Sequence, residues 1–299
     1  MKYISVILLF STWLIASSIP PCSEYQGKPK YIAGKSPAVN MLIQSINHFV
    51  FPEKISKNDP TFKKIDDVET LAKEGVDLVV LWNSNDNYQD LAQKLSQIGI
   101  AACSLNLDTL DQYPNAIMTL GRIMQAETRA QDLATFMQSR LEMLNELRAK
   151  IPQEKRLRVY YARGSSGLQS ACASSSHAEI ITIAGGINPI ECSAMAKALV
   201  SLNPEMLLKI NPDVIITDNK EFFDTLHDTA SIFQYLKAVT TSQIYLIPNK
   251  PANWADSPPS LLRLLGAMWL FKQLYPNEIS YDLDREIKQF KRLYLNQGN

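Results

Sequence analysis

Polar and aromatic side chains directly follow several short apolar runs of this 299-residue chain. Aromatic rings stack on planar or bulky ligands, an arginine holds anionic groups through charge-assisted hydrogen bonds, and asparagine amides both donate and accept. Side chains of these types are suited to binding a small molecule. The candidate ligand-binding residues are Trp82, Asn83, Asn85, Tyr161, Arg163, Asn219, Trp254 and Asp256.

Several of these candidates have a structural alternative. Trp82 and Trp254 are equally compatible with rings that fill the core beside their strands. Arg163 is also compatible with a surface ion pair, although its position directly after an apolar run favours ligand contact. Tyr160 and Tyr161 are adjacent, and adjacent residues of a strand point to opposite faces, so at most one of them reaches a ligand.

The sequence lacks the motifs of the common catalytic sites. It contains no GxSxG elbow, no HExxH, no P-loop and no GxGxxG after a strand. We therefore expect no catalytic residue and no resident cofactor, and we predict a binding protein rather than an enzyme. A rival hypothesis is an exported hydrolase with paired carboxylates, for which the candidates are Asp86, Asp218 and Asp256.

The histidines and cysteines lack the spacing of a metal site. His177 lies in a Ser-Ser-Ser-His-Ala-Glu segment, where a metal ligand is one interpretation and a serine-capped helix turn is the one we favour. Cys172 and Cys192 either pair in an oxidising compartment or pack as reduced thiols, and the two alternatives have equal weight. No cluster of cysteine and histidine occurs, so we predict no metal ligands.

The candidate residues must be positioned by alternating strands and helices. Each strand-like run is nearly all apolar rather than alternating, as in strands buried on both faces of a parallel sheet. Helical stretches lie between the runs, for example at 87–97 and 260–275. The predicted fold class is therefore α/β with parallel sheets covered by helices. The predicted strands are Asp77–Trp82, Ile100–Leu105, Arg158–Ala162, Asp213–Thr217 and Ile244–Ile247.

A short helix-and-strand phrase occurs twice, at 69–80 and 205–216. Two copies predict two Rossmann-like lobes with a ligand cleft between them, because ligands of open parallel sheets bind beyond the carboxyl ends of the strands. The segment from Asn115 to Lys150 contains no proline, and its apolar residues recur at helical spacing. It predicts a single long helix of roughly 50 Å that links the lobes.

The N-terminus has the features of a secretory signal peptide. Lys2 precedes an apolar run that ends in small residues, so we predict cleavage after Ser18 and export. The run is too short to be a membrane anchor. Lipid attachment at Cys22 ranks second, because Pro21 stands where that modification needs a small residue. The predicted organisation is a signal peptide at 1–18, an N-terminal lobe at 19–115, an interlobe helix at 116–151 and a C-terminal lobe at 152–299.

Several fragments, taken in their order and spacing, resemble the periplasmic substrate-binding proteins of ABC importers for iron-siderophores, haem and cobalamin. In that family one long helix joins two lobes, and the resemblance covers the chain from the end of the signal peptide. The fragments are Leu120–Ala130, Ala184–Asn188, Val200–Ile216, Trp254–Pro259, Leu265–Leu270 and Leu274–Pro276.

The resemblance implies a role for the glutamate of each repeat. In the family these residues, here Glu69 and Glu205, dock onto arginines of a membrane permease, and two like charges on separate lobes suit a two-fold symmetric partner. A solvated helix face is the alternative for both. The first repeat departs from the family pattern, because Gly75 and Val76 replace the usual Lys-Pro before Asp77.

The resemblance also implies a periplasmic ABC transporter solute-binding protein that delivers a metal chelate to an inner-membrane permease with its ATPase. An iron-siderophore is favoured, and cobalamin, haem, a nickel chelate and molybdate or tungstate are alternatives. Haem would need an axial ligand, for which Tyr161 and His177 are the candidates. Membrane contact is expected only through the permease or a lipid on Cys22. The 30 basic and 30 acidic residues balance, so no nucleic-acid partner is expected.

Overall fold

The computed structural model describes most of the chain. The described residues are 19–47, 68–83, 88–192, 198–228, 231–256 and 259–295. The predicted signal peptide and the candidate residues Asn85 and Asp86 lie outside these ranges.

The first lobe contains a parallel three-stranded sheet of β1 (Ile32–Gly34), β2 (Leu78–Trp82) and β3 (Ala101–Leu105). The order β1-β2-β3 places β2 in the centre, and its first four residues are buried. This burial explains the unbroken apolar run of β2, because both faces of the strand are covered. The helices of this lobe are α1 (Pro37–Asn47), α2 (Val68–Lys73) and α3 (Gln89–Gln97).

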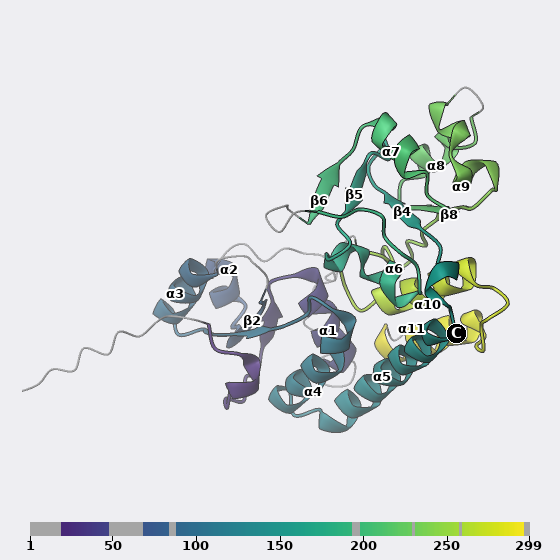
Figure 1. Cartoon of the computed structure of the whole chain (residues 1–299). Coiled ribbons are helices and arrows are strands. Elements are labelled where there is room, and N and C mark those ends of the chain that lie inside the picture. Colours follow the sequence, from purple (N-terminus) through teal and green to yellow (C-terminus); the bar gives the residue numbers. More distant parts are fainter. Residues whose placement is uncertain are drawn as a thin grey trace, which may run out of the picture.

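The second lobe contains a parallel sheet in the order β4-β7-β8 and an antiparallel pair, β5-β6 (Figure 1). Its central strand, β7, is buried along its whole length. The strands are β4 (Val159–Ala162), β5 (Gln169–Ala171), β6 (Leu199–Ser201), β7 (Val214–Thr217) and β8 (Ile244–Leu246). The helices from here to the end are α6 (Glu179–Ile183), α7 (Pro204–Ile210), α8 (Lys220–Thr225), α9 (Lys237–Thr240), α10 (Arg263–Leu274) and α11 (Leu283–Tyr294).

The described residues also include short 3-10 helices. They are η1 (Cys22–Glu24), η3 (Leu110–Gln112), η4 (Gln153–Lys155), η5 (Ser176–Ala178) and η6 (Ile232–Tyr235). The α/β fold class and the two sheets are therefore as predicted, and each predicted strand lies within one residue of an observed one at both ends. The sequence prediction missed β1, β5 and β6, which are only three residues long.

A single helix links the lobes as predicted, but it is shorter than the predicted 116–151, because two helices occupy this segment. They are α4 (Tyr113–Ile123) and the 23-residue α5 (Glu127–Ala149). The break lies at Gln125, whose φ of 55° is left-handed and interrupts the helical backbone. Gly121 faces Ala130 across the break, where a side-chain carbon would overlap it. The chain therefore folds back at residue 125, and α5 alone leads from the first lobe to the second (Figure 1).

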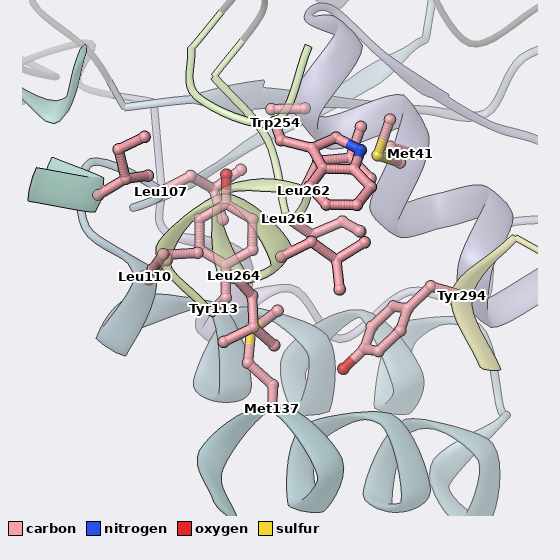
Figure 2. Packing of buried hydrophobic residues seen from close by; sticks show 14 of the residues in the cluster. Met41, Leu107, Leu110, Tyr113, Met137, Trp254, Leu261, Leu262, Leu264 and Tyr294 are labelled. Carbon is pink, nitrogen blue, oxygen red and sulfur yellow. The ribbon is translucent and has the colours of Figure 1, made fainter. Parts of the chain in front are cut away.

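One apolar core continues through both lobes. It includes Met41 of α1, Tyr113 of α4, Trp254, Leu264 of α10 and Tyr294 of α11, and Figure 2 shows these side chains around one interior. Two smaller clusters cover the opposite faces of the sheets, one in each lobe. The lobes are consequently joined by a shared core as well as by α5.

The C-terminal helix α11 packs against the first lobe. The Ser45 hydroxyl of α1 donates to the Tyr294 carbonyl oxygen at 3.0 Å, and Arg129 of α5 contacts the carbonyl oxygens of Ser45 and Leu293. Residues 283–295, which the sequence placed with the C-terminal lobe, thus also contact α1.

Each lobe is crosslinked by one disulfide. Cys172 pairs with Cys192, which was one of the two alternatives from the sequence, and Cys22 pairs with Cys103 of β3, which was not predicted. A lipid at Cys22 would need the same sulfur atom that the disulfide uses. The observed pairing therefore argues against lipidation there.

Candidate functional site

Six polar side chains meet at the carboxyl edge of the second sheet. Because β4, β7 and β8 are parallel, the loops that follow them emerge at the same edge. A short turn before α6 adds one histidine to these loops. We refer to this group as the Asp256 cluster, and its members are Tyr161, Arg163, His177, Asp218, Asn253 and Asp256.

The carboxylate of Asp256 is the centre of the cluster. Its side chain has no exposed surface. Oδ1 accepts the Tyr161 hydroxyl at 2.5 Å, and Oδ2 lies 2.6 Å from His177 Nδ1 and also accepts Arg163 Nη1. A buried carboxylate requires such partners, since an unpaired charge in the interior is strongly unfavourable.

The loop that carries Asp256 is held by Asn253. Its Oδ1 accepts the backbone N–H groups of Ala255 at 2.7 Å and Asp256 at 3.0 Å, and its Nδ2 donates to Asp218 Oδ2 at 3.3 Å. Asn253 is itself buried. This side chain therefore fixes the Asp256 backbone and links it to the end of β7.

Burial shifts the proton affinities of two other members. Burial and the neighbouring Asp256 charge raise the pKa of Asp218 above its ordinary value. Burial, followed by the charges of Asp256 and Asp218, raises the pKa of Tyr161 well above its usual range. The Tyr161 phenol is therefore neutral at physiological pH and donates a hydrogen bond to Asp256.

Arg163, His177 and Asp218 are the members that are only partly buried. The Arg163 and His177 side chains are 16% and 25% exposed, and the Arg163 guanidinium lies 5.3 Å from the centre of the Tyr161 ring. The buried Asp256 carboxylate orients these two side chains, and an oriented guanidinium beside an imidazole is suited to holding an anionic group. Chemically, this edge offers a guanidinium to an anionic group, next to the carboxyl groups of Asp218 and Asp256.

Three of the residues predicted from the sequence are brought together here, namely Tyr161, Arg163 and Asp256. The two adjacent tyrosines point to opposite faces as expected, because Tyr160 lies in the outer cluster of the lobe and donates its hydroxyl to the Gly167 carbonyl oxygen at 2.9 Å.

Trp254 and Asn219 have structural contacts instead. Trp254 is 5% exposed, lies in the shared core and donates Nε1 to the Lys250 carbonyl oxygen at 3.1 Å (Figure 2). This geometry favours the packing alternative for Trp254 over ligand stacking. Asn219 caps α8, since its Oδ1 accepts the Phe222 N–H at 2.8 Å.

His177 combines the two interpretations that the sequence offered. The Ser175 hydroxyl accepts the His177 N–H at 3.2 Å and caps η5, as favoured, while the imidazole contacts Asp256, 79 positions away. No spacing in the sequence indicates a contact at that separation. Asp218 was named from the sequence as a candidate carboxylate of the rival hydrolase rather than as a ligand-binding residue.

The carboxyl edge of the first sheet carries Trp82 and Asn83. The indole Nε1 of Trp82 donates to Asp108 Oδ1 at 3.0 Å, and Asn83 Nδ2 donates to Asn106 Oδ1 at 2.9 Å. Trp82 is partly exposed and Asn83 is exposed. This edge offers an aromatic surface and amides, whereas the second edge offers charge.

Glu69 and Glu205 occupy equivalent and exposed positions in the first turns of α2 and α7. Each helix precedes a strand and runs back along its sheet, so its first turn lies toward the carboxyl edge. Asn203 caps α7 by accepting the Met206 N–H at 2.8 Å. Both glutamates are therefore at the rim of the edges that carry the candidate ligand residues.

The described residues lack two features, a metal-binding group and a membrane-spanning helix. No group of three or more His, Cys, Asp or Glu side chains there is arranged to hold a metal ion. In the same parts of the chain, no helix combines the length and the apolar character needed to cross a bilayer.

Known proteins show clear similarity to this chain. A family model described as periplasmic binding protein matches residues 61–251. Over 163 residues, or 52% of its length, the chain is 25% identical to the high-affinity heme uptake system protein IsdE of Staphylococcus aureus. The aligned part spans about half, 54%, of that relative.

Solved structures agree over nearly the whole chain. An ABC transporter solute binding protein from Sulfurospirillum deleyianum has a TM-score of 0.82 and 29% identity, and the match covers 94% of this chain and 95% of that one. The molybdate periplasmic binding protein MolA of Haemophilus influenzae has a TM-score of 0.71, 18% identity and coverages of 94% and 98%. The second likeness concerns the fold alone.

Proposed function

Because the chain belongs to the periplasmic binding protein family, we propose that it is the solute-binding component of an ABC importer. It captures an anionic solute between its two lobes and delivers it to an inner-membrane permease. The Asp256 cluster is the observation that carries this proposal. Arg163 and His177 are held by a buried carboxylate at the edge where ligands of parallel sheets bind.

The first candidate ligand is an anionic metal chelate, with an iron-siderophore favoured. Arg163 pairs with its negative charge, and Trp82 contacts its organic part. The likeness to a heme uptake protein supports a large metal-containing ligand. A scavenger that works below micromolar concentration needs about 8 kcal/mol or more of binding free energy, which a largely preformed site supplies best.

The second candidate is a small oxyanion such as molybdate or tungstate. The burial of Trp254 favours it, because the second edge then presents N–H donors rather than an aromatic wall. For haem, His177 is the better axial candidate, because the Tyr161 hydroxyl is buried and bonded to Asp256.

Protein purified with its natural ligand distinguishes these candidates. Native mass spectrometry gives the mass of the bound solute, and absorbance reports ferric chelate, corrinoid or haem. A coloured complex whose binding weakens strongly in Arg163→Met supports the metal chelate. A colourless protein that binds molybdate tightly would replace the first candidate by the second, and tight binding of a neutral sugar or a cationic peptide would contradict both.

Glu69 and Glu205 are proposed to dock onto the permease. Replacing both by arginine is expected to abolish solute uptake while ligand affinity stays unchanged, because the glutamates lie at the rim rather than among the cluster residues. Glu74→Arg is the matched control, since Glu74 is exposed just after the end of α2. An equal loss of ligand affinity in the double variant would show that these glutamates are not docking residues.

The proposed location is the periplasm, reached through the signal peptide predicted at residues 1–18. The Cys22–Cys103 and Cys172–Cys192 disulfides support an oxidising compartment. Because Cys22 is crosslinked, contact with the membrane is proposed to occur through the permease.

A further inference from the structure

Arg263 is a buried charge in the first turn of the apolar helix α10. It is 1% exposed, and leucines precede and follow it at Leu262 and Leu264. A guanidinium has five N–H donors and no uncharged form in proteins, so it must find acceptors on every side. Its acceptors come from both lobes.

The first-lobe acceptors lie in the segment that follows β3. Arg263 Nη2 donates to the Leu107 carbonyl oxygen at 3.0 Å and lies 3.3 Å from the Tyr113 hydroxyl. Nη1 donates to the Asp108 carbonyl oxygen at 3.0 Å. These bonds fix the backbone just beyond the carboxyl edge of the first sheet.

The second-lobe acceptors lie in η5 and α6. Arg263 Nη1 donates to Glu179 Oε2 at 2.7 Å and to the Ser176 carbonyl oxygen at 3.3 Å. The other oxygen of this carboxylate, Oε1, accepts the Leu110 N–H at 2.7 Å. Glu179 therefore also bonds across to the first lobe, and the ion pair crosslinks the two lobes twice.

Both ends of this bridge adjoin candidate ligand residues. Asp108, whose carbonyl oxygen accepts from Arg263, accepts the Trp82 indole N–H with its side chain. Ser176, the other carbonyl partner, directly precedes His177. A short path of hydrogen bonds thus connects Trp82 of one edge to His177 of the other.

We propose that Arg263 is a positioning residue that, together with Glu179, sets the separation between Trp82 and His177 and so keeps the ligand site preformed. The inference deepens the proposed solute-binding function and rests on it for the meaning of those two residues. Arg263 itself has no contact with the solute, because its donors face the interior.

The Arg140–Glu286 ion pair provides a matched comparison. It joins α5 to α11, with Arg140 Nε 2.9 Å from Glu286 Oε2 and side chains 22% and 12% exposed. It is an Arg–Glu pair between helices, like Arg263–Glu179, but its partners do not adjoin either carboxyl edge. Arg140→Met therefore reports the loss of an ion pair alone.

The Glu179 carboxyl gives the bridge a pH signature. Burial raises its pKa, whereas the Arg263 charge and the Leu110 N–H oppose that rise. Its folded pKa is above the ordinary 4.5, so its contribution to stability falls as the pH rises through this interval. Without Arg263 the pKa rises further. The charged or titratable groups that act on Glu179 are Arg263, Asp111 and Tyr113, and Asp108 also acts on Tyr113.

The test uses the ligand-free protein, so it does not depend on the identity of the solute. Lys94 and Glu221 are exposed sites, one in each lobe. Noncanonical residues at these two positions carry spin labels, and double electron–electron resonance measures the distance between the labels. Arg263→Met is expected to broaden this distance distribution and to make the Leu110 amide exchange about 10-fold faster or more. Arg140→Met is expected to leave both readouts at the wild-type level.

Two further variants separate positioning from folding. Glu179→Gln keeps the size of the side chain, but its single carbonyl oxygen can accept from only one of Arg263 and Leu110, so it is expected to fold and still broaden the distribution. Arg263→Lys keeps the charge but cannot reach both lobes, so it folds and still broadens the distribution. The destabilisation of Arg263→Met relative to wild type is expected to be larger at neutral pH than at acid pH.

The proposal is overturned if Arg263→Met and Arg263→Lys both leave the distance distribution unchanged, or if Arg140→Met broadens it to the same extent. The proposed transport function would be contradicted by a separate result, namely unchanged solute uptake in the Glu69→Arg, Glu205→Arg double variant.

Discussion

The repeated units are α2–β2 of the first lobe and α7–β7 of the second. The turn between helix and strand contains a residue at positive φ in both units, but the residue type differs. Each helix is followed by one residue at positive φ, Gly75 with 70° and Asn211 with 42°. Glycine and asparagine are the residues that adopt this conformation most readily at the end of a helix. The departure of the first repeat from the family pattern therefore preserves the turn.

The aspartate of each repeat has the same structural role. Asp77 Oδ2 accepts the backbone N–H groups of Lys30 at 2.7 Å and Tyr31 at 3.0 Å, just before β1. Asp213 Oδ2 accepts the Arg158 N–H at 2.7 Å, just before β4. Each carboxylate thus ties the entry of the central strand to the entry of its neighbour.

The lobes differ at the opposite end of their sheets. The first edge has Trp82 and Asn83 bonded to exposed partners, whereas the second has a buried carboxylate, Asp256, with Arg163 and His177 around it. The repeat therefore preserves a scaffold at the amino ends of the strands, and the loops at the carboxyl ends carry the chemistry. In the proposed function, the second lobe binds the charged group of the solute.

The largest difference between the lobes is expected from their disulfides. The Cys22–Cys103 pair closes a sequence separation of 81 residues and the Cys172–Cys192 pair one of 20. Loop-closure entropy predicts that replacing the first pair by serine costs about 4.5 kcal/mol and the second about 3 kcal/mol. Urea unfolding of the two double variants measures both values. Equal losses of unfolding free energy in the two variants would mean that the stabilisation by a disulfide does not depend on the length of the loop that it closes.

Next in size is the contrast between the two edges. Asp256→Ala leaves Arg163 and His177 without their buried partner and is expected to cost at least about 3 kcal/mol. Asp108→Ala removes the acceptor of one indole N–H at an exposed position and is expected to cost about 1 kcal/mol. Asp256→Asn keeps the shape without the charge and should fall between them. Comparable values for the two alanine variants would contradict the contrast.

A smaller effect is expected at the amino ends, where the lobes are alike. Asp77→Ala and Asp213→Ala should each cost about 2 kcal/mol, because each removes charge-assisted hydrogen bonds. Burial alone would raise the pKa of Asp213, but the hydrogen bonds and charges of Lys237 and Arg158 outweigh it and hold that pKa below its usual 3.8.

The Asp213 effect also has a defined pH dependence. Because the folded pKa is depressed, the stabilisation is present above 3.8 and is lost as the pH falls through the folded pKa. The deficit of Asp213→Ala should therefore shrink between neutral pH and about pH 3 in unfolding experiments. A deficit that is constant with pH would exclude the carboxylate charge as its source.

The smallest effects concern the turn residues. Gly75→Ala should cost about 1 kcal/mol, because alanine at positive φ is strained. Asn211→Gly should change stability by less than about 0.5 kcal/mol, since glycine suits the same conformation. Thermal unfolding of both variants tests whether the two turns are interchangeable. A large loss in Asn211→Gly would indicate that its side-chain bond to the Lys237 N–H at 2.7 Å matters more than its conformation.

Apolar periodicity was sufficient to locate the buried elements of the sheets. β2 and β7 are buried central strands, and unbroken apolar runs of that kind have few other interpretations. The break at Gln125 was not predictable in the same way, because neither glycine nor proline marks it and apolar spacing continues on both sides. β1 was missed because a three-residue strand has no period to detect.

The candidate site was predictable only in part. Strand ends identified Tyr161 and Arg163, since the edge where a parallel strand ends follows from the fold. The contact of His177 with Asp256 depends on how distant loops pack, which local patterns do not encode. Arg263 did carry a signal, because a charge with two leucines on either side is typical of a residue that is buried and paired.

The order of the four cysteines along the chain has a consequence for how the protein acquires its covalent structure. Both disulfides join consecutive cysteines, the first with the second and the third with the fourth. Of the three ways to pair four cysteines, this is the one formed by an oxidant that acts on thiols in the order in which they emerge. The native crosslinks thus require no later exchange of partners, and each lobe can be closed before the next one appears.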